Sequence, residues 1–224
     1  MSYPAHYAVA YEARASRLTT FFRLFMLLPH AIVFVFFEIA AGVLVFIAWF
    51  AILFTGRFPA GMFGFVERTL RYYARLNAYG ALMTDRFPAF GGGEPGDGYP
   101  VEYRLDSPER LSRLTTFFRA IMVIPAYVVL YFLNLAAAVV TFAAWFVILF
   151  TGRLPRGMFD FLLFCHRYLM RVVSYYSLVT DEYPWFQPED EPAAGTGAGF
   201  CPSCGHPRKP GEAFCASCGE PLPG

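Results

Sequence analysis

The sequence predicts an all-α integral membrane protein built from two tandem repeats, with a small separate module at the C-terminus. Hydrophobic residues make up 57% of its 224 residues and charged residues only 16%, against about 25% in soluble domains. Its 26 Phe and 14 Tyr are more apolar surface than one water-soluble core of this size can bury. A lipid bilayer is therefore expected as the second apolar environment.

The repeat is visible when the chain is compared with itself at an offset of 96 residues. Residues 16–23 and 112–119 both read SRLTTFFR, and the same offset aligns two TGR turns and two closing Thr-Asp-x-x-Pro segments without a gap. About half of the aligned positions are identical, which is typical of a tandem duplication. We place membrane repeat 1 at residues 3–90 and membrane repeat 2 at residues 99–186.

Each repeat begins with a short alternating segment, near residues 7–11 and 101–105, that is typical of a β-strand. A long apolar run follows in each repeat, at residues 24–54 and 120–150. As a helix this run measures about 46 Å, against a hydrocarbon core of about 30 Å. Each run is therefore either one long membrane helix or a helical hairpin, and the matched polar residues Glu38 and Asn134 mark the position at which a hairpin would turn.

A second helix is expected in each repeat after a turn rich in Gly and Pro, from about residue 63 to 83 and from 159 to 179. Both helices are amphipathic, with a stripe of arginines on one face. The matched positions in this stripe are Arg71, Arg75, Arg167 and Arg171.

The arginine stripe decides where we expect the second helices to lie. An arginine at the bilayer centre costs about 2.5–3.5 kcal/mol, whereas a Leu or Phe returns only about 0.3–0.6 kcal/mol. We therefore expect these helices in the headgroup layer, with the four arginines at the membrane interface. The alternative is a partly spanning helix whose arginines are buried against protein.

The composition changes after residue 186. Residues 187–199 are acidic and rich in small residues, which predicts a flexible linker. Residues 200–224 contain two Cys-x-x-Cys-Gly turns, which can supply four thiolates to one tetrahedral Zn²⁺ with no open coordination position. We expect a zinc ribbon with a structural zinc ion, although two disulfides or a redox pair is the alternative. The predicted ligands are Cys201, Cys204, Cys215 and Cys218.

The predicted zinc ribbon also indicates a compartment. Metal-bound thiolates are typical of a reducing environment, so the C-terminus is expected in the cytoplasm. The N-terminus is expected on the same side. Either a hairpin in the long apolar run or a second helix that spans the bilayer would let each repeat enter and leave the bilayer on one side. The first fifteen residues lack the basic segment and apolar core of a signal peptide. A net charge of +1 gives no basic field for nucleic acid, so none is predicted as a partner.

The repeated unit, with its SRLTTFFR, TGR and Thr-Asp-x-x-Pro motifs, resembles the bacterial membrane family catalogued as domain of unknown function 4389. The resemblance covers nearly all of residues 3–186 in two copies, and the C-terminal module looks like the small bacterial zinc ribbon often attached to membrane proteins. The resemblance implies an integral location in the bacterial inner or plasma membrane. It implies no activity.

Three functions are compatible with these features. We expect a non-enzymatic membrane scaffold or adaptor whose zinc ribbon binds a protein partner. The alternative is a small-solute or lipid transporter, or a channel-like protein, because repeats often bracket a central site. A lipid-modifying enzyme would depend on Asp85 and Asp181, which we instead expect to cap or end the second helices. The sequence contains no Ser-His-Asp set, phosphate-binding glycine loop or His-rich metal cluster.

Overall fold

Each repeat contributes one strand, a long apolar helical segment and a second helix to the fold. The computed structural model describes residues 3–108 and 110–185. Its elements, in chain order, are β1 (Ala5–Val9), α1 (Arg17–Thr55), α2 (Ala60–Gly80), η1 (Phe90–Gly92), β2 (Val101–Leu105), α3 (Arg113–Met122), α4 (Ile124–Thr151) and α5 (Arg156–Tyr176). The predicted linker at 187–199 and the predicted zinc ribbon at 200–224 lie outside the described residues.

The apolar run of repeat 1 forms one continuous helix, α1, of 39 residues. Ser16 caps its N-terminus through the side-chain oxygen, and Gly56 ends it with a φ of 71°, the left-handed conformation that glycine adopts most readily. Pro29 lies inside the helix without ending it. Glu38 is exposed along this helix and not in a turn, so the hairpin alternative is wrong.

The apolar run of repeat 2 is divided only at Val123, between α3 and α4. Pro125 stands in the first turn of α4, where its missing N–H costs nothing because that group has no partner within the helix. From there α4 continues for 28 residues through Asn134. Both long runs are thus extended helices, as one of the two alternatives predicted.

The shorter elements lie close to their predicted positions. α2 and α5 begin after Pro59 and Pro155, and each starts and ends about three residues before the predicted bounds. The strand predicted at residues 101–105 is confirmed as β2, whereas β1 ends at Val9, two residues before the predicted end. Glycine and proline mark the turns, and alternating apolar and polar residues mark the strands. Both signals are local, so the sequence alone predicts where these elements lie.

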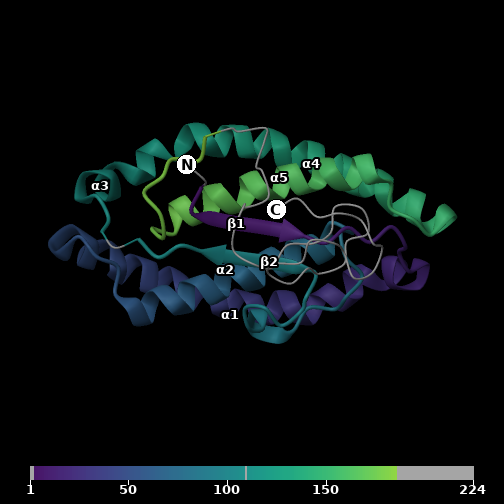
Figure 1. Ribbon diagram of the computed structural model, residues 1–224, viewed down its shortest axis with the longest axis horizontal. Helices are drawn as coiled ribbons and strands as arrows, with labels where there is room; N and C mark the ends of the chain where they lie inside the picture. Colours follow the sequence, from purple (N-terminus) through teal and green to yellow (C-terminus); the bar gives the residue numbers. More distant parts are fainter. Residues whose placement is uncertain (1–2, 109, 186–224) are drawn as a thin grey trace, which may run out of the picture.

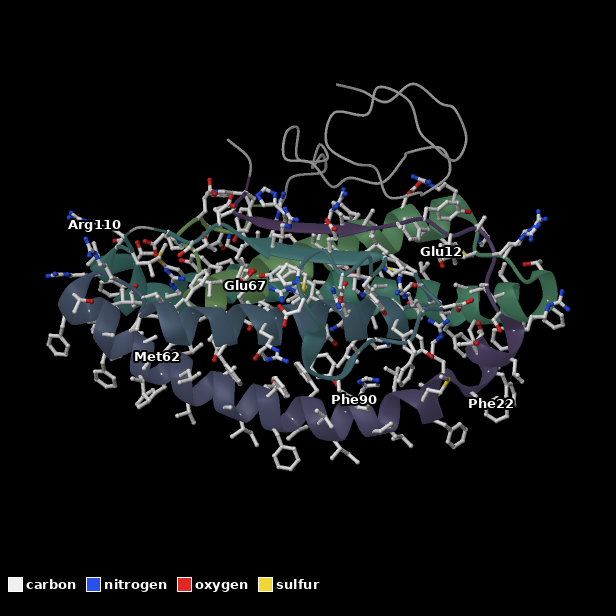
Figure 2. All side chains as sticks on the ribbon, turned by 60° about the horizontal axis from the view of Figure 1, so that its bottom comes forward. Glu12, Phe22, Met62, Glu67, Phe90 and Arg110 are labelled. Carbon is white, nitrogen blue, oxygen red and sulfur yellow. The ribbon has the colours of Figure 1, made fainter. Side chains whose placement is uncertain are left out.

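The elements form layers that run along the longest axis of the molecule (Figure 1). Figure 2 shows α1 on one outer side, α2 in the middle and the two-stranded sheet on the other side, and the repeat assigns α4 and α5 the equivalent places. All three layers contribute to the core, for example through Val66, Val101, Ile148 and Leu162. The fold is mostly helical, as predicted, but the sheet makes the all-α description incomplete.

A pseudo-two-fold axis relates the two repeats. It passes through the antiparallel sheet at Tyr7 and Tyr103, which pair with each other and are equivalent at the repeat offset. In both directions, a tryptophan indole of one repeat donates to a threonine carbonyl of the other; the pairs are Trp49–Thr116 (3.1 Å) and Trp145–Thr20 (3.2 Å). A homodimer with a two-fold axis shows the same self-complementary contacts.

Each strand packs on the second helix of the other repeat. β1 lies against α5, and β2 lies against α2. The contact includes a hydrogen bond of 3.3 Å from Arg167 Nε to the carbonyl of Tyr7, and an edge-to-face contact of 5.0 Å between the rings of Tyr11 and Phe159. The repeats therefore exchange strands, and neither completes its core alone.

Candidate functional site

One outer face of the molecule is covered by exposed apolar side chains. On α1 they recur every three or four residues from Leu18 to Phe54, and on α3 and α4 they extend from Leu114 to Phe150. At the ends of these stripes, Phe54 and Phe150 leave 77% and 79% of their surface exposed. Figure 2 shows the side chains of α1 pointing away from α2 and the sheet. Soluble monomers rarely expose a contiguous apolar patch of more than a few hundred Å², so this face is a candidate contact surface.

The opposite face is polar, because inward apolar side chains alternate with outward, mostly polar side chains along the strands. Tyr7 and Tyr103 point inward and are buried, whereas Arg104 points outward and is exposed. At the end of the sheet, His6 Nε2 lies 3.2 Å from Asp106 Oδ2. The molecule thus has an apolar face on α1 and α4 and a polar face on the sheet.

Two helices of the described chain, α1 and α4, are long and apolar enough to cross a membrane. Little of their apolar surface is covered by other parts of the protein, since most of their large side chains are exposed. This is the property expected of helices in contact with lipid.

The last arginine of each SRLTTFFR motif is buried at the junction of two helices. Arg23, only 3% exposed, forms an ion pair with Asp85 and donates to the carbonyls of Tyr79 and of Thr84, the latter at 2.9 Å. Its guanidinium also lies 4.4 Å from the centre of the Tyr79 ring. The second carboxylate oxygen of Asp85 accepts from the backbone N–H of Ser16, at the start of α1.

Repeat 2 builds the same cluster. Arg119 pairs with Asp181 and donates to the carbonyls of Tyr175 and Thr180, both at 2.6 Å. Asp181 also accepts from the backbone N–H of Ser112. Asp85 and Asp181 therefore attach the end of the second helix to the N-terminus of the apolar run, which is a structural role. They were expected to cap or end the second helix; they lie beyond it and bind the first turn of α1 and α3.

The arginine stripe of α2 faces the segment that joins the two repeats. Arg75, only 2% exposed, forms a bidentate ion pair with Asp97 at 2.7 and 2.9 Å, and its guanidinium lies 4.6 Å from the centre of the Tyr99 ring. Arg71 is buried as well, and it donates to Glu67 at 3.2 Å and to the carbonyl of Gly93 at 3.3 Å. Both arginines thus anchor the joining segment to α2.

The ion pair affects the ionisation of the aspartate. Burial raises the pKa of Asp97, but the hydrogen bonds from Arg75 and from the backbone N–H of Tyr99 outweigh it, so the pKa lies below its ordinary value. Asp97 is therefore ionised at neutral pH. The charge of Arg75 is accordingly compensated inside the protein.

The stripe of α5 has protein partners too. Arg171 is buried, its Nη1 donates to the carbonyl of Trp185 at 3.3 Å, and its guanidinium lies 5.0 Å from the centre of the Tyr3 ring. Arg167 is partly buried and donates to β1. The four arginines predicted at the membrane interface thus contact other parts of the protein, namely the joining segment, β1 and the segment that follows α5. They are packed against protein, as in the alternative with arginines buried against protein. Headgroup binding by them stays a prediction.

A small cavity of about 10 Å³ lies beside the arginine stripe of α2, lined by Arg71, Arg75, Glu102 and Arg104 among others. A water molecule needs at least about 10–15 Å³ of such volume. The cavity is therefore too small for a solute or a lipid headgroup. The polar groups around it mostly bind one another or the joining segment.

The predicted metal ligands Cys201, Cys204, Cys215 and Cys218 lie outside the described residues, so the zinc site stays a prediction. Within residues 3–108 and 110–185, no group of three or more His, Cys, Asp or Glu side chains could hold a metal ion. The remaining cysteine, Cys165, is buried in α5, and burial raises the pKa of its thiol to about 11. It is a packing residue in the core.

Sequence reasoning missed the two Arg–Asp clusters. The signal was present, because Arg23 and Asp85 both recur at the repeat offset as Arg119 and Asp181. Their contact spans 62 residues of chain, however, and neither periodicity nor spacing connects such distant positions.

Comparison with known proteins agrees with this division of the chain. A family model described as "Domain of unknown function (DUF4389)" matches residues 17–91 and 113–187. Each match begins at the first residue of an apolar helical segment and ends just beyond the Thr-Asp-x-x-Pro motif. No curated protein and no solved structure matches the chain.

Proposed function

The chain belongs to the family described as domain of unknown function DUF4389, and from this premise we propose that it is a non-enzymatic membrane scaffold or adaptor. In this proposal α1 and α4 hold the protein in a bacterial cell membrane. The C-terminal zinc ribbon, on its linker, binds a protein partner in the cytoplasm. The observation that carries the proposal is the exposed apolar face, which extends from Leu18 to Phe54 and from Leu114 to Phe150.

The arrangement of the chain ends supports a common side for both. Tyr3 OH donates to the carbonyl of Glu182 at 3.0 Å, so the first described residues lie beside the last. Tyr3 lies two residues before β1, so both ends lie beside the sheet, which is opposite the apolar side chains of α1 (Figure 2). A ribbon that follows residue 186 would therefore start from the polar side.

The interior supports a structural role. The buried arginines Arg23 and Arg75 bind carboxylates and carbonyls of the protein, at a helix end and in the joining segment. A transporter would need a path for its solute, and the cavity of about 10 Å³ does not supply one. The transporter remains the second candidate, and movement of a solute by the purified protein in liposomes would favour it.

The adaptor is tested with two cysteine variants of the full chain. Cys201→Ser removes one predicted zinc ligand, and we expect it to lose the zinc measured by atomic emission and the partner recovered by pull-down from solubilised membranes. Cys165→Ala is the matched control, because this cysteine is buried in α5 and is not one of the predicted zinc ligands, and it should keep both. Partners that are equally recovered with Cys201→Ser would contradict the adaptor proposal.

A further inference from the structure

We propose that α1 and α4 do not cross the bilayer but lie flat in one leaflet, with the pseudo-two-fold axis along the membrane normal. The acyl chains of that leaflet would cover the apolar face, and the sheet would face the aqueous phase. This inference rests on the proposed membrane location. It concerns the orientation of the protein and the surface that the lipid covers.

The length of the apolar stripe favours a flat orientation. Exposed apolar residues extend along α1 from Leu18 to Phe54, which is about 54 Å at 1.5 Å per residue. A hydrocarbon core of about 30 Å would hold this stripe in a spanning helix only at a tilt of roughly 55°, beyond the 0–40° seen for spanning helices. A helix that lies in the leaflet contacts lipid along the whole stripe.

The sheet excludes an upright orientation more strongly. Both strands run along the same axis as α1 and α4 (Figure 1), so upright helices would place the sheet at the depth of the hydrocarbon. A two-stranded sheet has two open edges, and unpaired backbone N–H and C=O groups at lipid-exposed edges cost several kcal/mol each. Exposed Arg104 and the half-buried Glu102 would enter the hydrocarbon as well. With the helices flat, all of these groups lie on the aqueous side.

Glu38 gives an independent indication. It is exposed and lies two residues from the middle of the 39-residue helix α1. An upright α1 would hold this carboxylate near the bilayer centre, where an ionised side chain costs about 2.5–3.5 kcal/mol. A helix at the boundary between acyl chains and headgroups allows the carboxylate to reach the interface.

The pseudo-symmetry gives both repeats the same depth in this orientation. The axis is perpendicular to the sheet at Tyr7 and Tyr103, so it relates the two apolar stripes on the face opposite the sheet. With the axis along the membrane normal, matched side chains of the two repeats meet the same layer of the membrane. Upright helices would place matched groups in opposite leaflets.

The exposed arginines at the ends of the long helices lie where a flat orientation places the headgroup layer. Three matched pairs are exposed there, and they are Arg14 and Arg110, Arg17 and Arg113, and Arg57 and Arg153. Figure 2 shows Arg110 at one end of the molecule, on the sheet side of α1. Arginines at the edge of an apolar face bind the phosphates of anionic lipid headgroups. Charge and apolar surface together thus match one leaflet.

Cysteine labelling in membrane vesicles of defined sidedness tests the proposal, with an impermeant maleimide and with labelled peptides identified by mass spectrometry. Arg14→Cys and Arg57→Cys mark the two ends of α1. Flat helices predict that both are labelled from the same side of the membrane and neither from the other. Labelling of the two positions from opposite sides would overturn the proposal, because it requires that α1 spans.

Two further variants separate this proposal from the membrane location itself. Ala8→Cys, on the outer side of β1, should be labelled from the same side as the helix ends, whereas Phe36→Cys, on the apolar face, should be labelled from neither side. A chain that remains in the soluble fraction and reacts at Phe36→Cys would contradict the membrane location. A soluble oligomer protected at Phe36→Cys would instead indicate that a second copy covers the face, and it would overturn both proposals.

Discussion

Arg23 and Arg119 define the role of the repeated SRLTTFFR motif. Each guanidinium is buried, pairs with an aspartate, and donates to two backbone carbonyls near the end of the second helix. A buried cation is stable only when partners replace the lost water. The motif therefore joins the first turns of the long helix to the end of α2 or α5.

The variant Arg23→Ala tests this role. It leaves Asp85 without its cation and two carbonyls without a donor, so we expect a loss of about 3 kcal/mol in the free energy of unfolding. Thermal unfolding of the full chain in lipid nanodiscs measures the change. Arg104→Ala is the control, because Arg104 is exposed on the outer side of β2, and it should change the stability by less than about 0.5 kcal/mol. Equal stability of both variants would show that the Arg23 cluster is not a structural junction.

At the scale of elements, the sequence predicted most of the fold. The second helices begin and end within about three residues of their predicted bounds, because Pro59 and Pro155 mark their starts locally. The sequence alone did not decide between a long helix and a hairpin, since a polar residue at position 38 is compatible with either. The partners of Arg71 and Arg75 could not be predicted, because they lie in the joining segment, whose course over α2 depends on the tertiary fold.

The joining segment provides a prediction at this scale. Gly92 has a φ of 86°, and a Cβ atom there would lie 2.9 Å from the carbonyl oxygen of Arg68 and from the backbone N of Tyr72 in α2. We expect Gly92→Ala to lower the free energy of unfolding by about 2 kcal/mol or more, because backbone atoms of a helix cannot move aside.

Gly96→Ala is a matched control for this effect. Gly96 has a similar φ of 73°, but nothing lies within 4 Å of its Cβ position. The variant should lose only the conformational cost of about 1 kcal/mol. Thermal unfolding of both proteins, with limited proteolysis of the joining segment, distinguishes the two costs. Equal losses in the two variants would mean that the segment does not pack closely on α2.

At the scale of the whole molecule, the exchange of strands makes the two repeats one unit. β1 packs on α5 and β2 on α2, and matched contacts occur in both directions across the axis. Composition predicted an excess of apolar surface but not where this surface lies. Helix periodicity shows which side chains share a face of a helix, but it does not show what covers that face. The pseudo-two-fold axis through the sheet relates α1 to α4 and so places both stripes opposite the sheet, and Figure 2 shows this position for α1.

The orientation of the helices in a bilayer is the central claim, and polarised infrared spectroscopy of the unmodified protein in oriented bilayers measures it directly. The long helices α1, α2, α4 and α5 all run along one axis of the molecule (Figure 1), so the amide I dichroism reports a single common direction. Our account predicts helix axes close to the membrane plane. Helix axes within about 40° of the membrane normal, as in spanning helices, would contradict it.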